Sequence, residues 1–123
     1  MEYRGFRDLI VYKVSFKTAV EIFDLSKTFP REERYDLVDQ IRRSSRSVPA
    51  NIAEAWYKRR YEKAFVNKLT DAAGEAGETE VWLDFSLCHE YIPNTKYEYF
   101  IGKYSEIGKM LSSMMNNPGK FCH

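Results

Sequence analysis

Residues 40–56 read QIRRSSRSVPANIAEAW, and this stretch decides the fold of the chain. Apolar and small side chains recur within it at steps of three and four residues, which is the period of an α-helix that buries one face. The pattern begins slightly upstream and predicts one long amphipathic helix over residues 32–57. The positions of its buried stripe are Val38, Ile41, Ser45, Val48, Ile52 and Trp56.

Pro49 lies inside this predicted helix, where it removes one backbone hydrogen bond and costs about 3 kcal/mol or more. Two structures are compatible with it. Either the helix ends near Ser47 and a new one begins with Pro49 in its first turn, or a single helix continues with a kink. The apolar stripe keeps its phase through the proline, which favours the kink. Asn51 can then bond backbone groups that Pro49 leaves without partners.

Three other segments repeat apolar residues with the same helical period. Pro30 ends the first of them and Pro93 ends the third, because the residue before a proline is disfavoured in the α region. Short connections and the absence of a strand pattern predict an all-α protein, an antiparallel up-down-up-down four-helix bundle. We place its helices at residues 8–28, 32–57, 61–91 and 95–116.

The length and composition are those of one globular domain. The chain has 123 residues, of which 44% are apolar and 30% charged, so it can bury a core and is not expected to be disordered. We treat residues 1–123 as a single domain and expect residues 1–7 and 117–123 to fray. No apolar run approaches the ~18 residues of a membrane span, and Cys88 and Cys122 lack the spacing of a metal site or disulfide framework. These features favour a cytoplasmic protein.

Two glycines, Gly74 and Gly77, stand inside the third predicted helix. Each costs roughly 1 kcal/mol relative to alanine in a helix interior. Small residues at helical spacing usually mark a place where another helix comes close, so we expect a close helix contact at these two positions.

No catalytic or metal-binding group stands out in the sequence. A di-iron site in a bundle needs Glu-x-x-His pairs, but the residue three before His89 is Ser86. Cys88 and His89 are adjacent, so on a helix they point about 100° apart and make a poor nucleophile–base pair. Glu54 and Glu78 lie near apolar stripes, and we interpret them as partly buried acids paired with an arginine or with capping amides. We therefore expect no enzyme activity, no metal and no cofactor.

Charge is distributed unevenly along the chain, although the formal net charge is only +1. Residues 71–90 contain six acids and no lysine or arginine, whereas residues 42–63 are mostly basic. A basic surface can track nucleic-acid phosphates, and Tyr57 and Tyr61 among the cations can stack bases. The alternative is ordinary solvated faces, or charge pairing between neighbouring helices or subunits. The candidate nucleic-acid-binding residues are Arg42, Arg43, Arg46, Lys58, Arg59, Arg60 and Lys63.

The chain resembles a known family in the segments FRDLIVYKVSFKTAVEIFDLSKTFP (6–30), ERYDLVDQIRRSSRSVPANIAEA (33–55) and AAGEAGETEVWL (72–83). It is similar to the 23S rRNA intervening-sequence proteins of bacteria, which share their fold with the accessory variability determinant of diversity-generating retroelements. The chain departs from the family pattern at Ala55, where a glycine is usual, and at Glu75, where a small hydroxyl residue is usual. Six residues belong to the family motif, and we expect them to have structural roles: Gln40, Pro49, Asn51, Glu54, Gly74 and Glu78.

The resemblance implies a four-helix bundle that assembles as a ring-like homopentamer. In the retroelement relative, a positively charged ring surface is thought to bind nucleic acid and a reverse transcriptase. The abundance of aromatic residues by itself indicates only that the protein is not a monomer; the number five comes from the resemblance.

Two hypotheses follow from these observations. The first is a non-enzymatic oligomeric bundle that contacts RNA or DNA through its basic residues, with affinity that falls steeply with salt. The second is a protein-protein interaction module without nucleic-acid affinity, in which aromatic side chains such as Trp56 and Trp82 serve interfaces.

Overall fold

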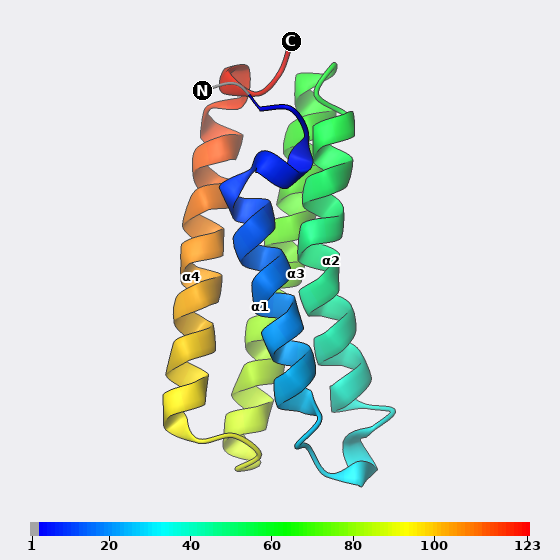
Figure 1. Ribbon diagram of the computed structural model, residues 1–123, viewed down its shortest axis with the longest axis vertical. Coiled ribbons are helices and arrows are strands. Elements are labelled where there is room, and N and C mark those ends of the chain that lie inside the picture. Colours follow the sequence, from blue (N-terminus) through cyan, green and yellow to red (C-terminus); the bar gives the residue numbers. More distant parts are fainter. Residues whose placement is uncertain (1–2) are drawn as a thin grey trace.

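The computed structural model describes residues 3–123 as four long helices joined by short connections. The helices lie side by side and alternate in direction (Figure 1). This arrangement confirms the predicted all-α four-helix bundle. No helix within residues 3–123 is long and apolar enough to cross a membrane. The long helices are α1 (Ile10–Ser26), α2 (Leu37–Tyr57), α3 (Glu62–Cys88) and α4 (Asn94–Asn116), and the short 3-10 turns are η1 (Phe6–Asp8), η2 (Arg31–Glu33) and η3 (Pro118–Lys120).

The hydrophobic core confirms the apolar stripe that decides the fold. Ile41, Val48 and Ile52 of α2 are completely buried, and Trp56 is buried beside them. They pack into one cluster with the inner faces of the other helices. The adjoining fully buried side chains are Ile22 of α1, Phe65, Leu69 and Leu83 of α3, and Ile107 and Leu111 of α4.

Pro49 does not interrupt α2, which is one helix from Leu37 to Tyr57. The alternative of two helices separated near Ser47 is therefore wrong. The ring of Pro49 is buried, so its apolar surface contributes to packing against α1. Asn51 Nδ2 donates to the carbonyl of Ser47 at 2.8 Å. That carbonyl lies two residues beyond the Ser45 carbonyl that Pro49 cannot satisfy, so Asn51 reinforces the helix without replacing the missing bond.

Several helix boundaries differ from the prediction for local reasons. Residues 31–33 form η2 rather than the first turn of α2, which begins only at Leu37. α3 ends at Cys88, before the predicted Tyr91, in a hydrogen-bonded C-terminal cap. There the amide of Tyr91 donates to the carbonyl of Ser86 and that of Glu90 to the carbonyl of Leu87, each at 2.9 Å. This pattern is the Schellman motif, and it holds Glu90 at φ 61° in the left-handed region.

Residues 3–7 and 117–123, expected to fray, pack on the bundle where α2 meets α3, and residues 1 and 2 lie outside the described part of the chain. Tyr3 stacks on Phe121 with ring centroids 5.6 Å apart, and Phe121 stacks on Phe65 at 5.9 Å. Tyr3 also meets Trp56 edge-on at 6.4 Å. Both termini therefore lie at one end of the molecule (Figure 1).

The glycines of α3 do not accommodate another helix of the same chain. A Cβ atom built on Gly74 or on Gly77 meets no atom within 4 Å. The expected close helix contact is therefore wrong within the described chain, and packing inside the bundle gives no reason for a glycine at either position.

Candidate nucleic-acid interface

The seven candidate cations fall into two separate groups in the structure. Arg42, Arg43 and Arg46 lie in the middle of α2. Of the other four, Lys58, Arg59 and Arg60 lie in the turn after α2, and Lys63 lies in the first turn of α3. Because an α-helix rises about 1.5 Å per residue, Arg43 and Lys58 are separated by roughly 20 Å along the axis. The fold therefore does not bring the seven cations together into one continuous binding patch.

Arg43 joins α2 to α3 and is neutralised there. Its Nη1 lies 3.0 Å from Glu75 Oε2, and its Nη2 pairs with Glu78. Gln40 accepts from Arg43 Nε at 3.3 Å, which orients the guanidinium. Glu78 is thus an acid paired with an arginine, as predicted, and the departure from the family pattern at Glu75 supplies a second carboxylate to the same arginine.

Arg42 and Arg46 hold α1 against α2 through Phe23. The guanidinium carbons of Arg42 and Arg46 lie 4.1 and 5.1 Å from the centroid of the Phe23 ring, which is cation–π geometry. Arg42 Nε also donates to Ser26 Oγ at 2.7 Å. Arg42 therefore has a structural role, while Arg46 remains exposed.

Glu54 is bound to α3 rather than to a substrate. Its Oε2 lies 2.6 Å from Lys68 Nζ, which also lies 3.5 Å from Asp71. The hydrogen bond from Lys68 to Glu54 is the main reason why the pKa of Lys68 is raised. Glu54 is thus a paired acid, as predicted, but its partner is a lysine, and its side chain is 56% exposed rather than partly buried. Within residues 3–123 no group of three or more histidine, cysteine or acidic side chains is placed to hold a metal ion.

The turn between α2 and α3 exposes both cations and aromatic rings. Lys58, Arg60 and Lys63 are exposed, and they alternate with Tyr57 and Tyr61, whose side chains are 78% and 65% exposed. Among residues 3–123, no carboxylate lies within salt-bridge distance of these three cations.

Arg59 differs from its neighbours because it is held by the protein. Its guanidinium carbon lies 3.5 Å from the centroid of the Trp56 ring, and its Nε donates to the Trp56 carbonyl at 2.8 Å. Arg59 therefore covers the buried Trp56 and fixes the direction in which the turn leaves α2. Because Trp56 is buried, it is not available for the partner interface suggested by the second hypothesis.

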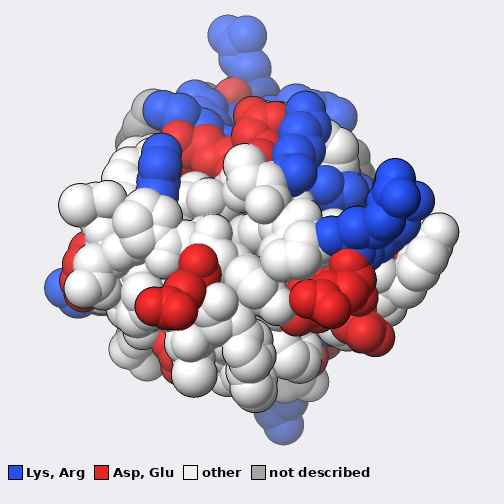
Figure 2. Space-filling view, turned by 90° about the horizontal axis from the view of Figure 1, so that it is seen from below, with Lys and Arg blue, Asp and Glu red and all other residues white. Residues whose placement is uncertain are grey.

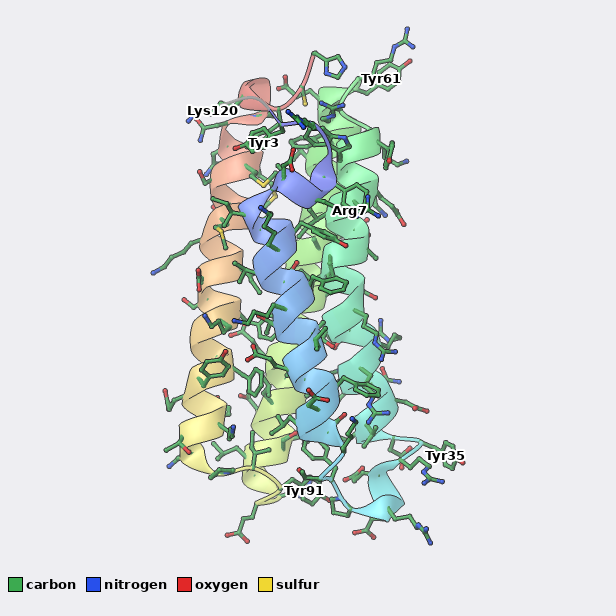
Figure 3. All side chains as sticks on the ribbon, in the orientation of Figure 1. Tyr3, Arg7, Tyr35, Tyr61, Tyr91 and Lys120 are labelled. Atoms are coloured by element: carbon green, nitrogen blue, oxygen red, sulfur yellow. The ribbon has the colours of Figure 1, made fainter. Side chains whose placement is uncertain are left out.

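The packed termini bring further cations to this end of the bundle. Phe6 packs against Tyr57 at 6.1 Å, and Arg7 lies over the Phe6 ring at 4.5 Å. Figure 3 shows Arg7, Tyr61 and Lys120 toward the end of the bundle that carries the termini. We use the name basic end for Arg4, Arg7, Lys58, Arg59, Arg60, Lys63 and Lys120.

Sequence reasoning missed Arg4, Arg7 and Lys120 because they are far from residues 58–63 along the chain. The sequence did contain one indication, the aromatic residues Tyr3, Phe6 and Phe121 beside these cations. Aromatic residues near a terminus indicate that the terminus packs on the bundle instead of fraying. The opposite end of the bundle differs in charge. Figure 2 shows acidic and basic side chains interspersed there around a broad uncharged area.

Comparison with known proteins agrees with this fold. A family model described as 23S rRNA-intervening sequence protein matches residues 7–113. The crystal structure of a protein with unknown function from the S23 ribosomal protein family from Bacteroides thetaiotaomicron superposes with a TM-score of 0.79. The two sequences are 37% identical, and the match covers 87% of this chain and 96% of that chain. No curated protein matches the sequence.

Proposed function

This chain belongs to the 23S rRNA-intervening sequence protein family, and we propose that it is a non-enzymatic, oligomeric four-helix bundle that binds RNA or DNA through its basic end. The supporting observation is that Lys58, Arg60 and Lys63 are exposed beside two exposed tyrosines, Tyr57 and Tyr61. From the family resemblance we take the oligomer to be a homopentamer. The protein acts in the cytoplasm, where its two free cysteines stay reduced.

The chemistry of the basic end fits single-stranded or unpaired nucleic acid. Lysine and arginine neutralise phosphates without regard to sequence. Exposed tyrosines stack on bases, each stacked base contributing about 1–3 kcal/mol. Duplex bases are not accessible to such stacking, so Tyr57 and Tyr61 favour unpaired strands. The same binding end repeated in an oligomer raises the overall affinity through multivalency.

The arginines in the middle of α2 contribute little to this interface. Arg43 is neutralised by two carboxylates and Arg42 is engaged with Ser26 and Phe23. We therefore place the nucleic-acid-binding surface at the end of α2 rather than in its middle, and we include Arg4, Arg7 and Lys120 in it.

Fluorescence anisotropy with labelled single-stranded RNA and DNA of mixed sequence tests the proposal. Reversing charge at the basic end with Lys58→Glu, Arg60→Glu and Lys63→Glu should weaken binding at least tenfold at 50 mM salt. A matched control reverses the exposed cations Arg31, Arg34 and Lys96 at the opposite end and should change affinity less than threefold. Equal losses in the two variants, or no binding by the wild type at low salt, would refute the proposal.

A protein-protein interaction module remains the second candidate, supported by a different observation. Apolar side chains are exposed on α1 and α3, far from the basic end, at Phe16, Val20, Val81 and Phe85. A protein partner that co-purifies while the ratio of absorbance at 260 and 280 nm shows no nucleic acid would favour this candidate.

A further inference from the structure

A hollow of about 300 Å³ lies between the start of α2 and the end of α3. We call it the aromatic pocket, because Tyr35, Trp82, Phe85 and His89 line it. Sites for small ligands have volumes of roughly 300–1,000 Å³, so this pocket has room for a small molecule. It lies at the end of the bundle opposite the basic end, where Figure 3 labels Tyr35 and Tyr91. The nucleic-acid interface proposed above does not use it.

One wall of the aromatic pocket is a row of rings on α3. Trp82 stacks on Phe85 with ring centroids 5.9 Å apart, and Phe85 stacks on His89 at 6.1 Å. The three residues follow each other at steps of three and four, so they share one side of the helix. Stacked rings at these separations are offset, which leaves part of each ring uncovered. Phe85 is 47% exposed, so this wall offers aromatic surface to a ligand.

The second wall comes from the segment between η2 and α2. Tyr35 belongs to this segment and is 78% exposed at the pocket. Aromatic rings gathered around one hollow are typical of sites that recognise quaternary ammonium ions, because the negative face of each ring attracts the cation. The rings alone would also accept a neutral apolar ligand, so the charge of the pocket decides between the two.

Two carboxylates, Glu33 and Asp36, complete the lining of the pocket. Glu33 is held in place from two sides. The Tyr91 hydroxyl donates to Glu33 Oε2 at 2.8 Å, and the Leu37 amide donates to Oε1 at 3.4 Å. A carboxylate has about four acceptor positions, so Glu33 can still face a positive charge after these two bonds.

Asp36 stands at the N-cap of α2 without acting as a cap. An aspartate at this position usually accepts hydrogen bonds from the amides of the first turn. The Asp36 side chain makes no such bond. Within residues 3–123 neither Glu33 nor Asp36 has a salt-bridge partner. Capping therefore does not explain the negative charge of Asp36, which is available to a ligand.

The cations around the pocket leave this negative charge in place. Within the described part of the chain, its lining contains neither a lysine nor an arginine. Gln40 lines the pocket and accepts from Arg43 at 3.3 Å, but Arg43 is neutralised by Glu75 and Glu78. The guanidinium carbon of Arg34 lies 6.0 Å from the centroid of the Tyr35 ring, which shows that a cation can approach this ring.

We propose that the aromatic pocket binds a small organic cation that carries a methylated ammonium group, with the rings around the methyl groups and Glu33 and Asp36 balancing the charge. A methylated ammonium matches both properties of the lining, because it is positively charged and its surface is apolar. Within residues 3–123, Glu33, Asp36 and His89 are not placed to hold a metal ion together. This inference goes beyond the proposed nucleic-acid binding and does not depend on it.

Isothermal titration calorimetry with choline chloride tests the pocket. Choline should bind saturably at one site per chain, and potassium chloride at the same ionic strength should not displace it. The neutral analogue 3,3-dimethyl-1-butanol has the same shape without the charge, so it should bind at least tenfold more weakly. Equal affinity for the two compounds, or no saturable binding of choline at tens of millimolar, would overturn the proposal. A trimethyl-lysine peptide that binds more tightly than choline would overturn the assignment to a small molecule.

Variants of the lining test which residues form the site. Phe85→Leu removes an aromatic ring and keeps an apolar side chain, and Asp36→Asn removes one charge. Both residues are exposed, so each variant should keep its helicity by circular dichroism and bind choline at least fivefold more weakly. Phe16→Leu is the matched control, because Phe16 is 51% exposed on α1 and lies outside the pocket; it should change the affinity less than twofold. Unchanged affinity in both pocket variants, or an equal loss in the control, would overturn the assignment.

Discussion

Thr79 Oγ1 and Ser44 Oγ lie 2.8 Å apart in the centre of the bundle, where both residues are fully buried. The pair joins α3 to α2 at the same level as the Arg43 contacts with Glu75 and Glu78. A buried hydroxyl left without a partner costs about 1–3 kcal/mol, so this pair helps to set the register of the two helices.

Thr79→Val keeps the shape of the side chain and removes the hydroxyl. We expect the free energy of unfolding to fall by about 1–2 kcal/mol, because the Ser44 hydroxyl then keeps only its long bond to the Ile41 carbonyl, at 3.5 Å, in the core. Urea denaturation followed by circular dichroism measures this change. Adding Ser44→Ala should cost less than the sum of the two single changes; strict additivity would contradict the coupling.

Arg43→Gln removes the charge between α2 and α3 at a site where the arginine side chain is 47% exposed. Exposed ion pairs contribute about 0–1 kcal/mol, so the unfolding free energy should fall by less than about 1 kcal/mol. Nucleic-acid affinity should stay within twofold of the wild type in the anisotropy assay. A tenfold loss of affinity would show that Arg43 leaves its carboxylates to bind phosphate.

Glu90→Gly should stabilise the protein. Glu90 has φ 61° in the cap of α3, a conformation that costs about 1–2 kcal/mol for a residue with a side chain but little for glycine. Glycine also increases the conformational entropy of the unfolded chain, which offsets part of this stabilisation. We therefore expect the free energy of unfolding to rise by up to about 1 kcal/mol. Thermal unfolding of Glu90→Gly and of the control Glu90→Ala checks this, and equal melting temperatures would contradict it.

Glu80→Gln should change the pH dependence of stability. The folded state raises the pKa of Glu80 above its ordinary 4.5, chiefly through burial, so it binds the proton more tightly than the unfolded chain does. Stability is therefore lost as the pH rises from the unfolded pKa through the folded pKa. Glu80→Gln should remove this loss at neutral pH and have little effect below pH 4.5. Denaturant unfolding at pH 4 and pH 7 measures the difference, and a larger gain at pH 4 would contradict the sign.

The prediction of the fold from sequence succeeded where the signal was local. The stripe through Ile41, Val48 and Ile52 correctly indicated a buried helix face, and its unbroken phase correctly indicated that α2 continues through Pro49. The limits of the helices were less predictable. The cap that ends α3 at Cys88 depends on backbone hydrogen bonds and on the left-handed conformation of Glu90, which no composition rule anticipates.

The candidate site was harder to predict, because a charged residue in a sequence does not reveal its partner. The prediction from sequence placed Arg42, Arg43 and Arg46 in the same set of candidate nucleic-acid-binding residues as Lys58, Arg60 and Lys63. Glu75 and Glu78, which neutralise Arg43, are more than thirty positions away along the chain. Arg4, Arg7 and Lys120 were overlooked for the same reason.

The sequence by itself determined which segments are helical and which side of each is buried, because both follow from spacing within a few turns. Only the tertiary structure decided which cations are neutralised and which remain exposed at the basic end, and which faces of α1 and α3 are left without a partner. Those properties depend on distances between residues of different helices. Such distances are set by how the helices pack, and residues 40–56 alone cannot specify them.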